Sequence, residues 1–492
     1  MSHDSLPTII QGGMGAGVSG WRLARAVSVA GQLGVVSGTA LDVILTRRLQ
    51  LGDPGGHVRR ALESFPIPDV AQRILDRYYI PGGKSEDQSF RSKPIPVVQP
   101  SRHLEELLVA GNFVEVFLAK EDHDEPVGIN YLEKIQLPTL PSLYGAMLAG
   151  VDWVLMGAGI PRTIPGILEC LADGQPVELK INVVGADRGE EHLARFDPQA
   201  FLQGQTPTLV RPKFIAIIAS ATLGTMLVRR STGDVDGFVI EGPTAGGHNA
   251  PPRGPLQLSH EGEPIYGDRD LPNLKAIRAL GLPFWLAGSC AEPERIQEAR
   301  DAGATGVQVG TAFAYCEESD LDPGLKDQVL AASREGMATV FTDPLVSPAG
   351  FPFKVVQLDG TFSDDALCEQ RTRICDLGYL RHAYKTEDGL LGWRCPAEPV
   401  ADYVRKGGDE EETCGRKCIC NALMANVGLA QLQRDGKREM PLVTSGNDVE
   451  DVARFIKDGA LSYTACDVIE YLLRGTNPSL RPAAEPCAVS TC

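Results

Sequence analysis

The sequence predicts an α/β fold, a (β/α)₈ barrel with two insertions and a mainly helical C-terminal annex. Short apolar runs alternate with helix-like segments up to about residue 315. The runs are apolar throughout, which is typical of parallel strands covered by helices on both faces. Eight such runs occur, the number of strands in this barrel. They are Thr8–Gln11, Leu33–Ser37, Val127–Asn130, Trp153–Met156, Phe214–Ala219, Gly237–Glu241, Phe284–Ala287 and Gly306–Val309.

Helix patterns follow the strands where the barrel requires them. Trp21–Ala30 comes after the first strand and Pro293–Ala302 after the seventh. Proline suits the first turn of a helix because its φ is already fixed there. These segments therefore predict the outer helices of the barrel.

Spacing along the chain predicts the domain organisation. Residues 1–320 form the barrel, interrupted by insertions at about 43–126 and 172–212. Val114–Ala119 in the first insertion is a further strand candidate, which would shift the strand numbering by one, and Val177–Val184 in the second is also strand-like. Residues 321–476 form the annex, with helix patterns over Asn421–Leu432 and Val449–Leu473, and we expect it to cover the active site. Residues 477–492 form a flexible tail.

Charge and composition exclude some classes of function. The 492 residues carry 47 Lys and Arg against 64 Asp and Glu, a formal net charge of −17. Such an acidic chain is a poor partner for nucleic acid or for an anionic membrane, since both require a basic surface. The N-terminus, Met1–Asp4, lacks the basic and apolar regions of a signal peptide. We therefore expect a cytoplasmic protein without a nucleic-acid or membrane partner.

A glycine-rich loop after the first strand has two interpretations. Gly12–Gly20 contains Gly15-x-Gly17-x-x-Gly20, and Asp42 follows about 22 residues later, as in a dinucleotide-binding fold. Against this, the glycines begin directly after the strand as a doubled pair. Met14 also stands where an apolar side chain can meet a flat ring.

The ends of the later strands favour a barrel over the dinucleotide fold. Glu241–Asn249 follows the sixth strand and is rich in glycine, Gly288 and Ser289 follow the seventh, and Gly310 and Thr311 follow the eighth. Small residues at the last two strand ends let backbone N–H groups approach a phosphate, the usual phosphate position in such barrels. A dinucleotide fold does not require a second set of glycines so far along the chain.

These motifs together resemble the nitronate monooxygenase (2-nitropropane dioxygenase) family, which includes FMN-dependent enoyl-acyl-carrier-protein reductases and the enoyl reductases of polyunsaturated fatty acid synthases. The resemblance rests on Ile9–Met14, Ala245–His248, Gly306–Thr311 and the third-strand motif Gly128-Ile129-Asn130, and it covers roughly residues 7–48, 127–160 and 213–357. It implies an FMN-binding TIM barrel. The residues it places at the cofactor are Gly13, Met14, Gly15, Asn130, Glu241, Gly246, Gly247, Gly288, Ser289, Gln308, Gly310 and Thr311.

His248 is the candidate catalytic residue. It follows Ala-Gly-Gly at the end of a barrel strand, where barrel enzymes carry out their chemistry. A lone histidine is more often structural, but imidazole, with its pKa near 6.5, can exchange a proton with carbon at neutral pH. In the family it resembles, this histidine is catalytic.

Three functions remain open at this stage. The first is a flavin-dependent oxidation of alkyl nitronates, or of a related acidic-carbon substrate, with O₂. The second is reduction of enoyl thioesters of acyl carrier protein or coenzyme A, in fatty acid or polyketide biosynthesis, with NAD(P)H as the reductant of FMN. The third is a non-catalytic barrel scaffold. A small-molecule or acyl-thioester substrate follows from the first two, and a homodimer and an acyl carrier protein are compatible partners.

Six cysteines crowd into one part of the annex. They are Cys368, Cys375, Cys395, Cys414, Cys418 and Cys420. Clustered thiolates can bind zinc or an iron–sulfur centre, but the Cys-x₃-Cys-x-Cys spacing at the end of this run matches neither common zinc hairpins nor ferredoxins. We therefore expect no metal here and favour buried or redox-active thiols.

Overall fold

A closed barrel of parallel strands forms the centre of the protein in the computed structural model, which describes residues 6–204 and 207–474. Its eight-stranded sheet has the order β1-β11-β10-β9-β8-β4-β3-β2, and every pairing in it is parallel. A bridge from Ile10 to Leu33, just ahead of β2, closes the ring. The strands are β1 (Ile9–Gln11), β2 (Gly34–Ser37), β3 (Val127–Leu132), β4 (Trp153–Gly157), β8 (Lys213–Ile218), β9 (Gly237–Glu241), β10 (Phe284–Ala287) and β11 (Gly306–Val309). The predicted barrel is confirmed.

The barrel has an apolar interior and an apolar outer face, as its uniformly apolar strands require. Inside, Trp153 and Trp285 meet edge to face with ring centroids 5.8 Å apart, and they pack with Ile10, Val35 and Val239. Outside, the helices bury the opposite faces of the strands. These helices are α1 (Trp21–Val29), α5 (Arg102–Lys120), α6 (Thr139–Leu148), α7 (Ile164–Ala172), α9 (Ala221–Arg230), α10 (Leu274–Arg278), α11 (Pro293–Asp301) and α12 (Thr311–Ala314).

Both insertions adopt regular structure. The first contributes α2 (Leu41–Gln50), the 3₁₀ turn η1 (Pro54–Gly56), α3 (His57–Glu63) and α4 (Pro68–Tyr78), and the barrel helix α5 follows it. The second contributes β5 (Val177–Lys180), β6 (Val183–Val184), β7 (Leu193–Phe196) and α8 (Pro198–Phe201). The Val114–Ala119 segment is the last part of α5 and not a strand, so the strand numbering does not shift.

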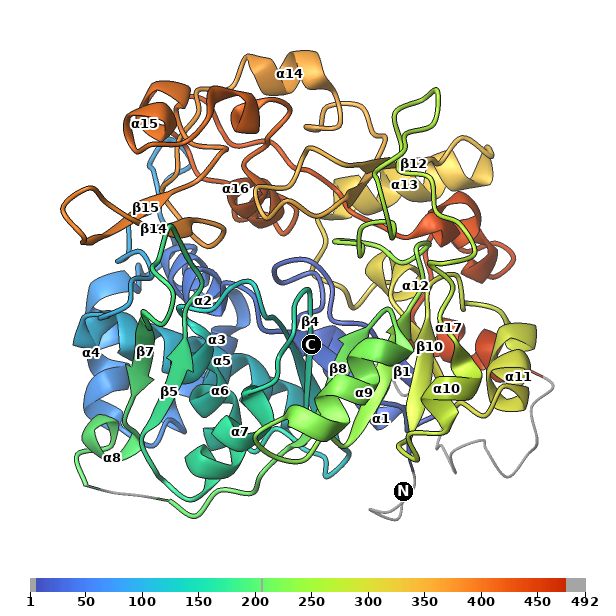
Figure 1. Ribbon diagram of the computed structural model, residues 1–492, viewed down its shortest axis with the longest axis horizontal. Helices are drawn as coiled ribbons and strands as arrows, with labels where there is room; N and C mark the ends of the chain where they lie inside the picture. Colours follow the sequence, from blue (N-terminus) through green and yellow to red (C-terminus); the bar gives the residue numbers. More distant parts are fainter. Residues whose placement is uncertain (1–5, 205–206, 475–492) are drawn as a thin grey trace.

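The last helix of the annex, α17 (Ala465–Leu472), lies beside the barrel against α1 and α11, whereas most of the annex lies over one end of the barrel, at the top of Figure 1. The annex is made of helices with two β-hairpins between them. Its elements are α13 (Pro323–Arg334), β12 (Val340–Asp343), β13 (Phe353–Val356), α14 (Asp365–Glu369), β14 (His382–Lys385), β15 (Leu391–Arg394), α15 (Val400–Arg405), η2 (Glu410–Thr413), α16 (Ile419–Ala425), η3 (Asn447–Phe455) and α17 (Ala465–Leu472). The tail expected over residues 477–492 lies outside the described residues.

Several contacts fix the annex to the barrel and its insertions. β14 pairs with β6 of the second insertion. Asp42 in α2 forms an ion pair of 2.6 Å with Lys93, both nearly fully buried, and accepts a hydrogen bond from the Tyr379 hydroxyl of the annex. Asp42 therefore ties the annex to the first insertion, which is not the ribose-binding role of a dinucleotide fold.

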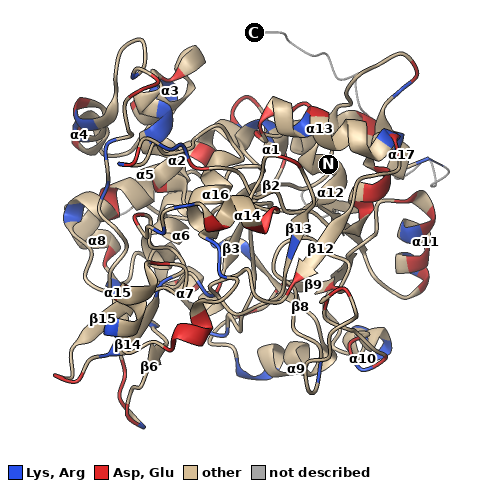
Figure 2. Cartoon of the chain, turned by 90° about the horizontal axis from the view of Figure 1, so that it is seen from above, with Lys and Arg blue, Asp and Glu red and all other residues tan. Residues whose placement is uncertain are grey.

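The surface of the outer helices carries mixed charge. In Figure 2, Lys and Arg alternate with Asp and Glu along α4 and α11. Within the described residues, no helix is both long and apolar enough to cross a membrane.

Candidate active site

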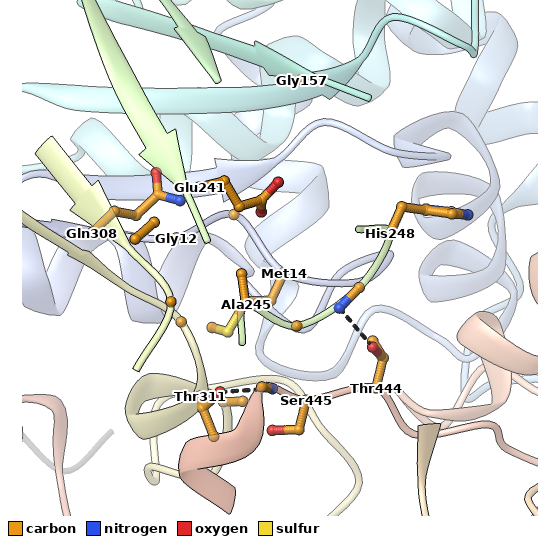
Figure 3. A pocket seen from close by; sticks show the side chains of 18 of the residues that line it. Gly12, Met14, Gly157, Glu241, Ala245, His248, Gln308, Thr311, Thr444 and Ser445 are labelled. Carbon is orange, nitrogen blue, oxygen red and sulfur yellow. Dashed lines mark hydrogen bonds between the residues drawn. The ribbon is translucent and has the colours of Figure 1, made fainter. Parts of the chain in front are cut away.

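A cavity of about 200 Å³ lies at the carboxyl ends of the barrel strands. The ends of β1, β3, β9, β10 and β11 form most of its wall, and annex residues complete it (Figure 3). Each residue that the sequence places at the cofactor, and His248 as well, lines this one cavity. These are Gly13, Met14, Gly15, Asn130, Glu241, Gly246, Gly247, His248, Gly288, Ser289, Gln308, Gly310 and Thr311.

The first strand end is shaped by a buried glutamine. Gln11 Nε2 donates to Ser19 Oγ at 2.9 Å, and Ser19 Oγ accepts the Met14 N–H at 2.9 Å. The glycine-rich loop is thereby folded back on itself, with Met14 at the cavity wall. Gly13 has to be glycine, because a Cβ there would lie 2.4 Å from Asn130 Cβ.

Small residues at the ends of β10 and β11 form one end of the cavity. Gly288 and Ser289 adopt positive φ angles of 99° and 48°. This conformation is easy for glycine and unusual for serine. Gly310 and Thr311 lead into α12. This end of the cavity has small side chains, which would let backbone N–H groups approach a phosphate.

Glu241 ends β9 inside the cavity. Burial raises the pKa of its carboxyl group to about 8, because a charged carboxylate loses hydration there. At neutral pH the side chain is therefore protonated and can donate a hydrogen bond. The carboxamide oxygen of Gln308, another lining residue, is buried without a hydrogen-bond partner among the described residues.

His248 stands where the cavity meets the annex. Its Nε2 and Ser347 Oγ share a hydrogen bond of 2.6 Å, and its ring packs edge-on against Phe353 with centroids 4.7 Å apart. Burial lowers the pKa of His248 to about 4. The imidazole is consequently neutral at pH 7. It can accept a proton, but it is not present as the imidazolium that would act as an acid.

Annex residues missed by the sequence analysis close the cavity from the far side. Gly247 N–H donates to Thr444 Oγ1 at 3.0 Å, and Gly446 N–H donates to Thr311 Oγ1 at 2.9 Å, as Figure 3 shows. Gly246 and Gly446 touch so closely that a Cβ on Gly246 would lie 2.7 Å from Gly446 N. The signal in the sequence is the small, polar Thr444–Asn447 segment, which follows no strand and so could not be placed.

A second, apolar chamber adjoins the cavity at His248. Its wall combines the barrel side chains Leu132 and Ile135 with the annex side chains Leu380, Leu423 and Met424. Thr39, Leu132, His248 and Leu423 belong to both spaces. The histidine thus separates a partly polar compartment from an apolar one.

Among the described residues, no group of three or more His, Cys, Asp or Glu side chains is arranged to hold a metal ion. The cysteines at 368, 375, 395, 414, 418 and 420 are free thiols.

Comparison with known proteins identifies relatives of part of the chain. Residues 178–347 match the family model described as nitronate monooxygenase. A probable nitronate monooxygenase of Bacillus subtilis is 36% identical over 99 residues, which is 20% of this chain and 27% of that protein. The nitronate monooxygenase of Pseudomonas aeruginosa is 29% identical over 142 residues, 28% of this chain and 38% of that protein. The chain thus matches less than two fifths of each relative's length.

Two solved structures are similar over a larger part of the chain but at lower identity. FabK from Thermotoga maritima aligns over 96% of this chain and 92% of its own, with 17% identity and a TM-score of 0.47. A nitroalkane oxidase from Streptomyces ansochromogenes aligns over 95% and 94%, with 15% identity and a TM-score of 0.43. The family match of residues 178–347 agrees with the motifs at the strand ends, and this part of the chain is therefore similar to the nitronate monooxygenase family.

Proposed function

We propose that the protein is an FMN-dependent oxidoreductase of the nitronate monooxygenase type, oxidising alkyl nitronates or a related acidic-carbon substrate with O₂. The observation that carries this proposal is the position of His248. It is a neutral imidazole at the border between a glycine-lined cavity and an apolar chamber. The family match supports the same reaction class.

The cavity fits FMN by the chemistry of its lining. Gly288, Ser289, Gly310 and Thr311 would hold the phosphate, with small side chains at two neighbouring strand ends. Met14 would lie against the ring system. The unpartnered oxygen of Gln308 and the protonated carboxyl group of Glu241 offer an acceptor and a donor for its polar edge. When bound, FMN supplies the one- or two-electron chemistry that amino-acid side chains lack.

The chain's own groups would handle the proton. In the tautomer in which Nε2–H of His248 donates to Ser347 Oγ, Nδ1 carries no hydrogen and is the ring atom that would take a proton from an acidic carbon. With its pKa lowered, the ring is unprotonated over the whole neutral range. Glu241, protonated at pH 7, can donate a hydrogen bond to negative charge without adding a charge of its own. The apolar chamber would exclude water from the alkyl part of the substrate.

The second candidate is an NAD(P)H-dependent enoyl reductase that acts on thioesters of acyl carrier protein or coenzyme A. The apolar chamber favours it, because side chains such as Leu132, Leu380 and Met424 would suit an acyl chain next to His248. This reaction needs a proton donor as well as a reductant. His248, whose pKa is lowered, would have to gain a proton before it could donate one. The family match is to nitronate monooxygenase, and this function therefore ranks second.

An anaerobic titration of the FMN-loaded protein separates the candidates. Loss of absorbance near 450 nm on adding an alkyl nitronate, but not on adding NAD(P)H, is the expected result. Rapid bleaching by NAD(P)H followed by reoxidation with an enoyl thioester would instead establish the reductase. Protein that is colourless and cannot be reconstituted with FMN would refute both activities, and a non-catalytic barrel scaffold would then be the remaining function.

A further inference from the structure

Four cysteines of the annex line one small cavity. Cys375 lies in the segment after α14, Cys395 directly follows β15, and Cys418 and Cys420 lie at the start of α16. Pro348, Leu377 and Leu380 complete the wall. Cys368 and Cys414 are outside it. The fold therefore brings together four of the six cysteines that lie close together in the sequence.

Two of these thiols are neighbours. Cys375 and Cys395 line the same small cavity, and each side chain shifts the pKa of the other, so a small movement would bring their sulfur atoms to bonding distance. Cys395 is 5% exposed, whereas Cys375 is partly open to solvent. A small oxidant can reach Cys375 first and leave Cys395 to react within the protein.

We propose that Cys375 and Cys395 form a redox-active dithiol, which hydrogen peroxide oxidises to an intramolecular disulfide. The Cys375 thiolate attacks one peroxide oxygen, the O–O bond breaks, and hydroxide leaves as the sulfur becomes a sulfenic acid. The Cys395 sulfur then attacks this sulfenic sulfur, and water leaves as the S–S bond forms. Altogether, two thiols and one peroxide give one disulfide and two waters.

The surroundings assign the attacking role to Cys375. The hydrogen bond from Cys395 and the nearby Arg381 guanidinium lower the pKa of the Cys375 thiol, and the thiolate is the reactive form. The same contact, together with burial, raises the pKa of Cys395 well above its usual value. Burial raises the pKa of Cys418 to about 11 and raises that of Cys420 as well. These three thiols stay protonated at neutral pH.

A zinc site explains the cluster less well. Zinc needs its thiol ligands deprotonated and arranged as a tetrahedron. Among the described residues, no group of three or more His, Cys, Asp or Glu side chains is arranged to hold a metal ion. The pairing of Cys375 with Cys395 suits a disulfide better than a four-ligand site.

The dithiol lies against the wall of the apolar chamber. Leu377, Leu380 and Cys420 line both the cysteine cavity and the chamber that contains His248. A bond from Cys375 to Cys395 would fix one end of the segment that carries Leu377 and Leu380. Oxidation should therefore slow amide hydrogen exchange over residues 377–380. If the two thiols do not react, treatment with peroxide should leave the exchange of these amides unchanged.

The test treats the full-length protein, reduced and purified anaerobically, with one equivalent of hydrogen peroxide, and maps its peptides without reduction. We expect a Cys375–Cys395 linkage that dithiothreitol reverses. Cys395→Ser should accumulate a dimedone-reactive sulfenic acid on Cys375, and Cys375→Ser should lose thiols at least tenfold more slowly than wild type. Cys418→Ser and Cys420→Ser, from the same cavity, are the matched controls and should still form the linkage.

Three results would overturn the proposal. They are a linkage between a different pair of cysteines, a rate of thiol loss in Cys375→Ser equal to that of wild type, and stoichiometric zinc or iron released when these thiols are modified. Peptide mapping of the wild-type protein decides the question even where a variant folds poorly.

Discussion

Replacing Glu241 with Gln should change how the stability of the protein depends on pH. Glutamine keeps the size of the side chain and its ability to donate a hydrogen bond, but it cannot ionise. The pKa of Glu241 rises from 4.5, the value in an unfolded chain, to about 8 in the fold. Between these values the folded protein holds a proton that the unfolded chain has lost, so wild-type stability falls as the pH rises from about 4.5 to 8.

The size of the effect follows from the two pKa values. Each pKa unit corresponds to about 1.4 kcal/mol. Compared with a side chain that never ionises, linkage then destabilises the folded protein by about 0.8 kcal/mol at pH 5 and by about 3.3 kcal/mol at pH 7. The free energy of unfolding of wild type should therefore fall by up to about 2.5 kcal/mol relative to Glu241→Gln over this interval. Because Glu241 lines a cavity, screening by solvent would reduce the effect of burial on its charge, which makes this an upper figure.

Urea unfolding of the FMN-free protein at pH 5 and pH 7 measures this difference. The control variant is Glu387→Gln, which neutralises an exposed glutamate and should keep the wild-type pH dependence. Parallel pH dependences for wild type and Glu241→Gln would show that Glu241 is ionised in the fold, which would refute its role as a neutral hydrogen-bond donor.

Three further changes test other parts of the structure. His248→Ala should keep FMN binding, measured by absorbance near 450 nm, but lower turnover about 10²- to 10⁴-fold, the usual contribution of a proton-transfer group; unchanged turnover would exclude this role. Gly246→Ala should raise the Kd for FMN at least tenfold, because its Cβ would meet Gly446 N. Flavin fluorescence measures this Kd. The control variant Gly267→Ala, whose Cβ would lie in open space, should bind FMN like wild type. Lys93→Met should lower the free energy of unfolding by about 3–5 kcal/mol, because it leaves the buried Asp42 carboxylate without its cation. Adding Asp42→Asn should recover most of this loss. A loss below about 1 kcal/mol in Lys93→Met would show that the ion pair is dispensable.

The barrel could be predicted because its strands carry a strong local signal. Runs such as Phe214–Ala219 are apolar on both faces, as a strand covered on two sides requires, and they recur with helix patterns between them. The apolar pattern of Val114–Ala119 was ambiguous, because α5 is buried nearly all round and so lacks a polar stripe. A short apolar run cannot be assigned to a strand or a helix by periodicity alone.

The site could be predicted only where its residues follow a strand. His248 and Gly288 stand at strand ends, and the barrel brings such ends together. Thr444 and Gly446 lie far from any barrel strand, and their place depends on how the annex folds back. Which of the six cysteines come together, Cys375 and Cys395 among them, likewise depends on tertiary packing. Sequence spacing does not determine which thiols meet.

The hydrogen bonds that Thr444 and Thr311 accept have a consequence for the order in which the protein matures. A ribosome releases the barrel strands long before it makes residues 444–446, which hold the Gly247 loop and Thr311 in place. An emerging chain that ends after β11 would have the strands but an incomplete cavity wall. We therefore expect FMN to be captured only after most of the annex has been synthesised, so that flavin content in the cell reports on complete chains and not on folded barrels.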